Sequence, residues 1–239
     1  MKHALFLSLA TLALGACSVV PQASGARYMA SESSSPVDRA GSQPGSTRVS
    51  APPPIARGAA ENQCLSQLGQ AGVRFDALPD RYLGQGCSTL NTVQMHALAG
   101  DTGQLGVSNL GPVTCPVSSA FAAWARYGVD RAAQQIFGSP LASIQTMGSF
   151  ACRNVAGTGR RSAHASADAI DVSGFVLADG RSISVRSGWS GSPQEREFLR
   201  VVQRSACRRF DTVLGPDYNA DHHDHFHVEG VIEGNSYCR

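Results

Sequence analysis

The sequence lacks a long apolar run at its start, a strong excess of either charge, C-x-x-C pairs and internal repeats. The apolar run over residues 4–14 is shorter than the roughly 20 residues that a transmembrane helix needs. The net charge is only +2 at pH 7, with no long basic block, so nucleic acid is not an expected partner. Without C-x-x-C pairs, a zinc site built from cysteines has little support.

The first residues are typical of an export signal. The apolar run ends in Leu-Gly-Ala-Cys17, and small residues directly before a cysteine resemble the lipobox of bacterial lipoproteins. This resemblance implies cleavage before Cys17 and acylation of its sulfur, and several acyl chains give a stable membrane anchor. A plain secretory signal with an incidental cysteine is the alternative. We therefore predict a signal peptide over residues 1–16 and a membrane-anchored envelope protein; Ser18 favours the outer membrane, facing the periplasm, if there is one.

Composition divides the remaining chain into a tether and a folded domain. Residues 17–60 are rich in Ser, Pro, Ala and Gly and show no apolar periodicity, which predicts a disordered tether. Residues 61–239 form one predicted domain of the α+β class with a largely antiparallel sheet, because helical and strand patterns mix without a regular βαβ order. The expected helices cover residues 61–69, 118–127, 129–137 and 193–210; the expected strands cover 93–98, 105–113, 144–152, 169–176, 183–185 and 225–231.

Besides Cys17, an even number of cysteines remains in a chain that we expect to be exported. This combination predicts disulfides. We expect each cysteine to pair with its neighbour in the sequence, as Cys64–Cys87, Cys115–Cys152 and Cys207–Cys238.

Histidines and aspartates gather in two distant segments. The first reads Ser162-Ala-His164-x6-Asp171 and the second reads Asp221-His-His-Asp-His-Phe-His227. Alternate residues of a strand face the same side, so His225 and His227 are expected to point together. Asp171 lies in an apolar run, where a carboxylate is costly unless it is paired or bound to metal. Imidazole and carboxylate are zinc ligands, and three of them leave a fourth position open for chemistry.

Each segment taken alone has a simpler explanation. The second could be a histidine-rich surface tract that binds metal without catalysis. Asp171 could form an ordinary ion pair with Arg160 or Arg161.

Together the two segments resemble the LAS metallopeptidases, a superfamily that includes lysostaphin, D-Ala-D-Ala peptidases and hedgehog. The match is closest to extensin-like C-terminal domains, which share paired cysteines and a stretch such as Phe150-Ala-Cys-Arg153. The resemblance implies a hedgehog-like or DD-peptidase-like fold that binds one zinc ion. It also implies the following roles: zinc ligands His164, Asp171 and His227; catalytic residues His225 and Arg153; and Ser162 and Asp168 as residues that hold the loop, the substrate or the ligands.

The sequence departs from the family pattern at two places. Many members have glycine where this chain has Ala167, and a Glu-x-x-His pair where this chain has His-x-His. The second departure leaves the general base open, with His225 favoured over His222 and Asp224. The predicted function is zinc-dependent hydrolysis of peptide or amide bonds in peptidoglycan. The alternatives are a zinc-containing domain that binds the cell wall or a partner without cleavage, and a purely structural envelope lipoprotein.

Overall fold

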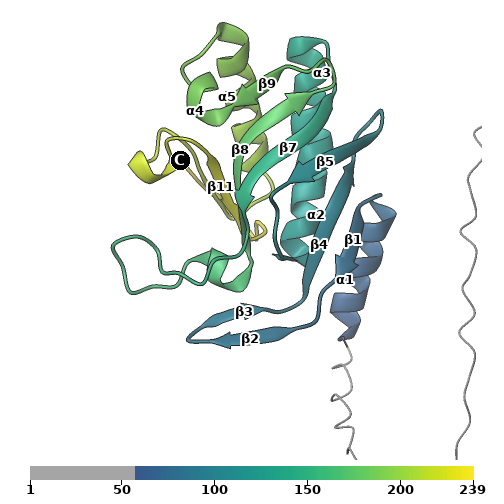
Figure 1. Ribbon diagram of the computed structural model, residues 1–239, viewed down its shortest axis with the longest axis vertical. Helices are drawn as coiled ribbons and strands as arrows, with labels where there is room; N and C mark the ends of the chain where they lie inside the picture. Colours follow the sequence, from purple (N-terminus) through teal and green to yellow (C-terminus); the bar gives the residue numbers. More distant parts are fainter. Residues whose placement is uncertain (1–56) are drawn as a thin grey trace, which may run out of the picture. The chain divides into compact units, whose positions relative to one another are not determined.

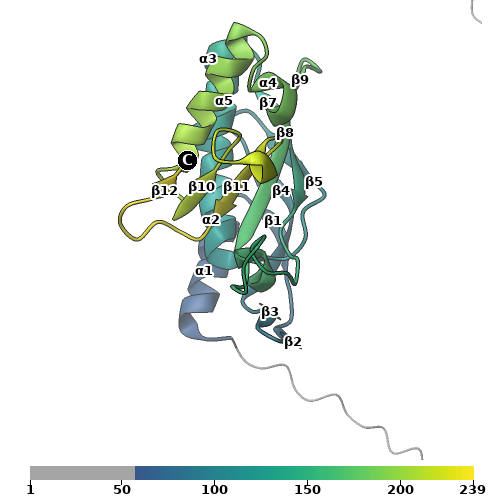
Figure 2. The same cartoon turned by 90° about the vertical axis from the view of Figure 1, so that its left-hand side faces the viewer.

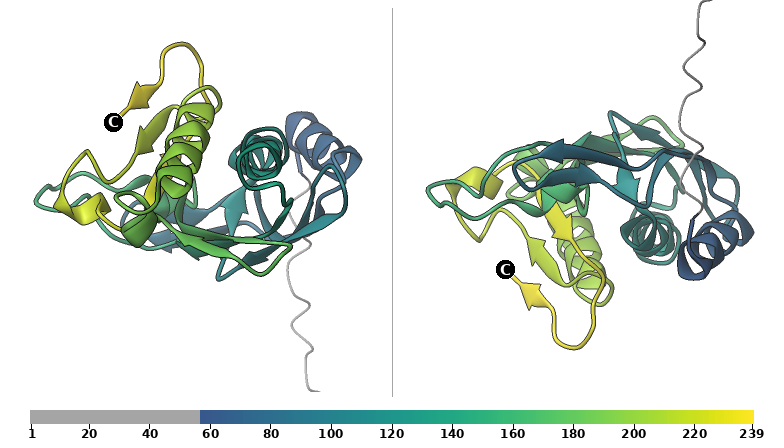
Figure 3. Two further views of the ribbon diagram at one scale, coloured as in Figure 1. Left: turned by 90° about the horizontal axis from the view of Figure 1, so that it is seen from above. Right: turned by 90° about the horizontal axis from the view of Figure 1, so that it is seen from below.

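A ten-stranded, mostly antiparallel sheet forms the centre of the domain in the computed structural model, which describes residues 57–239 (Figure 1). Helices cover one face of this sheet (Figure 3). The predicted α+β class and the single domain are therefore confirmed. The predicted signal peptide, Cys17 and most of the predicted tether lie outside the described residues. Within residues 57–239, no helix is long and apolar enough to cross a membrane.

The sheet has the strand order β1-β4-β5-β7-β8-β11-β10-β12, with β6 paired to β4 and β9 paired to β8. Two pairs, β5–β7 and β10–β12, are parallel, and the other pairs are antiparallel. Figure 2 shows β10, β11 and β12 side by side near the C-terminus. The strands are β1 (Arg74–Ala77), β4 (Thr92–Ala99), β5 (Gln104–Ser108), β6 (Val113–Thr114), β7 (Leu141–Gly148), β8 (Ala169–Leu177), β9 (Ser182–Ser184), β10 (Thr212–Leu214), β11 (Phe226–Glu229) and β12 (Tyr237–Cys238).

A separate hairpin projects from the domain beside the segment that follows β7 (Figure 1). Its strands are β2 (Arg81–Gly84) and β3 (Cys87–Thr89). The outer strand β2 is exposed along its whole length, whereas Cys87 of β3 is only 1% exposed. The hairpin is therefore attached to the domain through β3.

The helices largely follow the predicted positions. α1 (Ala59–Gln70) begins slightly before the predicted start of the domain, and α5 (Pro193–Ala206) ends before Phe210. Ser192 caps α5 by accepting a hydrogen bond from Glu195 N, while the Glu195 carboxylate accepts one from Ser192 N. This capping box and the proline at the first helical position explain why the sequence signal for α5 is clear. The shorter helical elements are the 3-10 helices η2 (Ala163–Ser166) and η3 (Ala220–His222) and the helix α4 (Val185–Gly188).

The two helices predicted over residues 118–127 and 129–137 are joined in the structure. α2 (Cys115–Trp124) continues through the π-helical segment η1 (Ala125–Asp130) into α3 (Arg131–Phe137). Gly128 lies inside this continuous helix and faces α5, where a Cβ atom would clash with Ser205 Oγ. Glycine is therefore needed at this position for close helix packing.

Two of the three predicted disulfide pairings are wrong. Only Cys207–Cys238 forms as expected, and it joins the end of α5 to β12. α1 packs against α2, so the cysteine of α1 meets the first residue of α2 rather than the hairpin. The hairpin cysteine instead meets the segment after β7. The other two bonds are Cys64–Cys115 and Cys87–Cys152. Three disulfides indicate a domain that folds in an oxidising, extracytoplasmic compartment.

Candidate metal centre

Two neighbouring strands bring Asp171 and His227 together. β8 and β11 are antiparallel, and His227 lies directly opposite Asp171 in their register. Phe226 and Val228 are fully buried in the hydrophobic core. Side chains alternate between the two faces of a strand, so the residue between them, His227, points to the opposite face. The burial of Phe226 and Val228 therefore fixes His227 on the same side as Asp171.

His164 reaches the same place from a loop. His164 lies in η2. The Ser162 hydroxyl accepts a hydrogen bond from His164 N, and the His164 carbonyl accepts one from Ala151 N. Ala167, which follows η2, has a left-handed backbone with φ +57°. Glycine adopts this conformation without strain, so Ala167 holds a backbone conformation that side chains rarely adopt. The loop is thus tightly folded, and the His164 side chain is only 2% exposed.

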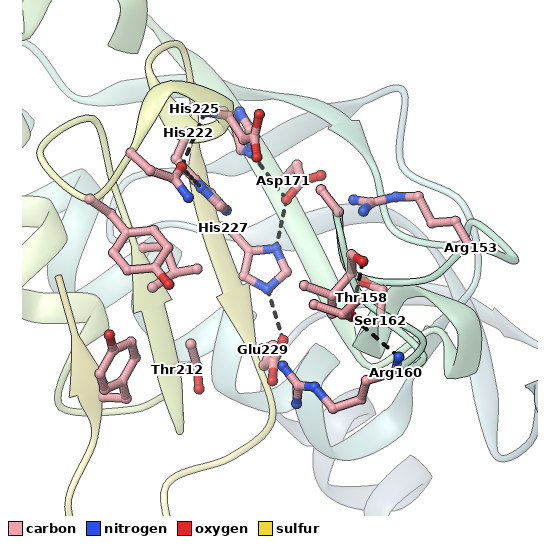
Figure 4. Close-up of a pocket in the computed structure, with 17 residues that line it drawn as sticks. Arg153, Thr158, Arg160, Ser162, Asp171, Thr212, His222, His225, His227 and Glu229 are labelled. Carbon is pink, nitrogen blue, oxygen red and sulfur yellow. Dashed lines mark hydrogen bonds and ion pairs between the residues drawn. The ribbon is translucent and has the colours of Figure 1, made fainter.

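The side chains of His164, Asp171 and His227 converge on one point (Figure 4 shows Asp171 and His227). One ligand atom from each lies within 4.8 Å of the others. His164 Nε2 is 3.2 Å from His227 Nδ1 and 3.2 Å from Asp171 Oδ2, and His227 Nδ1 is 2.9 Å from Asp171 Oδ1. The predicted ligand set is therefore a group that can hold a metal ion.

The hydrogen bonds of the outer ring nitrogens determine which nitrogen of each histidine carries the proton. His164 Nδ1 donates to the Ser149 carbonyl at 2.9 Å, and His227 Nε2 donates to Glu229 Oε2 at 2.9 Å. A carbonyl and a carboxylate only accept hydrogen bonds, so the outer nitrogens carry the protons. In the neutral rings the inner nitrogens are then acceptors, and they face the Asp171 carboxylate, which is also an acceptor. Three converging acceptors need a cation between them, which is the arrangement of a metal site with oriented histidines.

The pKa shifts of His227 and Asp171 also indicate that a positive charge stabilises this cluster. Burial lowers the pKa of His227, but hydrogen bonds with Asp171 and Glu229 outweigh it and raise the value to about 9. Burial also opposes ionisation of Asp171, yet hydrogen bonds with His164 and His227 hold its pKa well below the ordinary range. The carboxylate therefore stays ionised, and the cluster holds a proton tightly when no other cation is present.

His225 stands beside the three ligands without being one of them. It directly precedes β11, and its Nε2 is 3.5 Å from Asp171 Oδ1. Its Nδ1 donates to Asp224 Oδ1 at 2.9 Å, and this hydrogen bond lowers the pKa of Asp224. Asp224 therefore orients the ring, so that Nε2 of the neutral ring is an acceptor facing the metal centre.

His222 is a second imidazole at the edge of the site. Its ring centre lies 5.2 Å from that of His225 and 5.9 Å from that of His227. Nδ1 donates to Asn219 Oδ1 at 2.6 Å. Burial lowers the pKa of His222 to about 4, so the ring is neutral at physiological pH. It lines the site as an uncharged acceptor.

The metal centre lies in an open cavity of about 610 Å³. One wall is the segment between β7 and η2, which contributes Arg153, Thr158, Arg160 and Ser162 (Figure 4). The other wall includes side chains of β10, β12 and the segment before η3: the half-buried Thr212 and Leu214 and the exposed Tyr218 and Tyr237. The cavity is large enough for a small peptide segment to reach the ligands.

A family model described as the extensin-like protein C-terminus matches residues 62–239. The chain belongs to this family. No curated protein and no solved structure shows significant similarity to it. The match to the extensin-like domain includes every residue of the metal centre, so the ligands are part of the family domain itself.

The structure corrects the expected role of Asp168 and sets aside the alternative ion pair of Asp171. Asp168 does not orient the ligands: it accepts a hydrogen bond from Thr114 Oγ1 at 2.6 Å, and its backbone carbonyl accepts one from Gly230 N. Asp171 does not pair with Arg160 or Arg161, because its carboxylate is surrounded by histidines. Asp168 lies directly before β8, and its side chain bonds to Thr114 rather than to a ligand.

Glu229 is the orienting residue that the sequence interpretation missed. It lies two positions after His227 on β11, and therefore on the same face, and it accepts the His227 Nε2 hydrogen. That hydrogen bond also lowers the pKa of Glu229. The His-x-Glu spacing on a strand was the available signal, because it has the same period as His-x-His.

Glu229→Gln is expected to weaken metal binding by about 10- to 100-fold, the usual cost of losing a partner that orients a metal-binding histidine. Competition against a chelating dye measures the change. Glu233→Gln is the matched control, because Glu233 is exposed in the segment after β11. Equal affinities of the two variants would show that Glu229 does not support His227.

Proposed function

We propose that the extensin-like domain is a zinc-dependent hydrolase of peptide or amide bonds, and that its substrates are peptidoglycan peptides. The observation that carries the proposal is the convergence of His164, Asp171 and His227 in an open cavity. The motif resemblance to the LAS metallopeptidases supports the same ligand set. Disulfides support an extracytoplasmic location, where cell wall is available.

The donor set fits zinc. Two imidazole nitrogens and one carboxylate oxygen are the ligand types that zinc takes in hydrolytic sites, where three protein ligands leave one position open. When bound there, zinc would supply Lewis acidity for the carbonyl of the substrate. His164 and His227 would bind through Nε2 and Nδ1, because their other nitrogens are engaged with Ser149 and Glu229.

His225 is suited to act as general base and then as general acid. In hydrolysis, water adds to the carbonyl carbon, the C–N bond breaks, and the proton released by water must reach the leaving amine. His225 Nε2 faces the site, and Asp224 holds the opposite nitrogen. A histidine held in this way can accept the proton from water and return it to the amine.

Arg153 is suited to stabilise negative charge on the carbonyl oxygen. It follows Cys152 directly, and the Cys87–Cys152 disulfide fixes the chain there. In Figure 4 its guanidinium group extends toward Asp171 and the metal centre. A preorganised positive charge at that position favours the transition state over the ground state.

Anchoring through acylated Cys17, in an outer membrane and facing the periplasm, is part of the proposal. It would keep the domain beside its substrate. Fractionation of cells tests this part: the protein should sediment with membranes and be released by detergent.

The decisive experiment combines metal analysis with digestion of peptidoglycan. Zinc-loaded protein should yield new products in muropeptide profiles, and EDTA should prevent them. His225→Ala should keep its zinc and lose about 10²- to 10⁴-fold in kcat, the range for a general acid–base group. His223→Ala is the matched control, because His223 is an exposed member of the same tract and donates to Ala220 O.

Three outcomes would contradict the proposal in different ways. If the protein takes up no zinc, the domain is a structural envelope domain and not a hydrolase. Zinc-loaded protein that binds peptidoglycan and leaves it uncut would indicate a binding domain. Equal activity of the His225→Ala and His223→Ala variants would remove His225 from the mechanism.

A further inference from the structure

Arg160 and Arg161 are neighbours in the chain but point to different parts of the domain. Arg161 Nε donates to Gln85 O at 2.7 Å, and Arg161 Nη1 donates to Asn154 Oδ1 at 2.9 Å. These bonds attach the segment to the β2–β3 hairpin. Arg160 instead lines the cavity of the metal centre (Figure 4). Arg161 forms an isolated bridge with Asn154, whereas Arg160 lies in the bend directly before it.

The backbone around Arg160 is well fixed. Arg160 O accepts a hydrogen bond from Val155 N at 2.9 Å, and Arg160 N donates to Thr158 Oγ1 at 3.2 Å. Both bonds close the tip of the segment into a turn. The position of Arg160 above the cavity is therefore set by the fold, although its side chain is exposed.

The two guanidinium groups of the cavity have no partner within residues 57–239. Arg153 and Arg160 form no side-chain hydrogen bond or ion pair there. Some arginines outside the cavity, such as Arg126 and Arg200, are paired with aspartates, and others, such as Arg186, are not. The nearby carboxylates are already engaged: Asp171 and Glu229 both bond to His227. Unpaired guanidinium groups in a concave site are suited to bind anions from solution.

Arg153 and Arg160 lie at different ends of the metal centre. In Figure 4 Arg153 extends toward Asp171, whereas the guanidinium of Arg160 lies beside Glu229. A ligand that crosses the metal centre would thus meet one cation at each end.

We propose that Arg160 is a specificity-determining residue that binds a carboxylate of the substrate at the Glu229 end of the cavity. The inference rests on the proposed function and specifies its substrate: a peptide with a carboxylate on the Glu229 side of the bond that is cut. The planar fork of arginine pairs with a carboxylate through two parallel hydrogen bonds. Arg160 acts through binding, and it does not touch the reacting atoms.

Calorimetric titration of the zinc-loaded full chain with synthetic peptidoglycan stem peptides tests the proposal. Each peptide is used as the free acid and with one carboxylate at a time converted to an amide. The His225→Ala variant serves as a second background, so that cleavage does not disturb the titration. For one of the carboxylates, the free acid should bind about five- to tenfold more tightly than the amide, as expected for a half-exposed charge-assisted pair.

Arg160→Gln should remove that preference, Arg160→Lys should keep part of it, and Arg186→Gln should keep all of it. Arg186 is the matched control because it is an exposed arginine on α4, outside the cavity. Zinc affinity should be the same in all of these variants, which excludes an indirect effect through Glu229. The proposal is overturned if Arg160→Gln keeps the full preference, or if no carboxylate affects binding. A carboxylate preference in protein that never cleaves would refute the hydrolase and leave the role of Arg160 intact.

Discussion

Replacement of Asp171 by alanine is expected to abolish stoichiometric zinc binding. The Asp171 carboxylate lies within 3.2 Å of His164 Nε2 and 2.9 Å of His227 Nδ1, and it supplies the only negative charge among the three ligands. Loss of a partner outside the ligand set already costs about 10- to 100-fold in affinity. Loss of the charged ligand itself should cost more, and it leaves two neutral imidazoles whose acceptor atoms face one another.

Thermal unfolding with and without zinc measures this effect. At free zinc about 1,000 times the dissociation constant, binding stabilises the native protein by about 4 kcal/mol. For a domain of this size that corresponds to a rise of about 10 °C in Tm. The wild-type protein should show this rise, and the Asp171→Ala variant should show almost none.

Asp76→Ala is the matched control for Asp171→Ala. Asp76 also bonds to a histidine, His96, at 2.8 Å, but this pair is exposed and has no third ligand. Its removal should leave both the zinc content and the zinc-dependent rise in Tm unchanged. A full rise in the Asp171→Ala variant would show that zinc binds elsewhere.

Strand alternation predicts only part of the metal centre. Asp171 lies in an apolar run and His225-x-His227 has the period of a strand, so both indicate strands with one polar face. The structure pairs these strands as β8 and β11, with Asp171 opposite His227. His164 lies in a loop, and its place among the ligands came from the resemblance to the LAS metallopeptidases. The role expected for Asp168 was wrong, because this residue lies before β8 and its side chain bonds to Thr114.

The parts of the fold that escaped prediction depend on distant contacts. β10 and β12 are short strands that pair in parallel although more than twenty residues separate them in the chain. No local pattern marks such strands, since register and burial come from the neighbours that they pair with. The continuity of the helix through η1 also depends on a partner, because Gly128 is explained only by the contact with α5.

Disulfide pairing is the clearest feature that the sequence alone does not predict. Removal of one of these bonds is also expected to have a large effect on stability. Pairing follows the spatial arrangement of elements, and the Cys87–Cys152 bond closes a loop of 65 residues between the hairpin and the cavity wall. Substitution of both cysteines by alanine is expected to lower the free energy of unfolding by about 4 kcal/mol, from the chain entropy that the bond removes from the unfolded state. Urea denaturation measures the loss.

A second pair of substitutions separates stability from function. Cys64–Cys115 joins α1 to the start of α2 and closes a loop of 51 residues that does not include the cavity wall segment, so its removal should cost a similar 4 kcal/mol or so. Only the Cys87/Cys152 variant should also raise KM for peptidoglycan peptides, because Arg153 follows Cys152 directly and loses its fixed position. Zinc content should be normal in both variants, since His164 is held separately by Ser149 and Ala151. If both pairs raise KM equally under conditions where the protein stays folded, the Cys87–Cys152 bond has no special role in positioning Arg153, and the wall of the cavity is rigid without it.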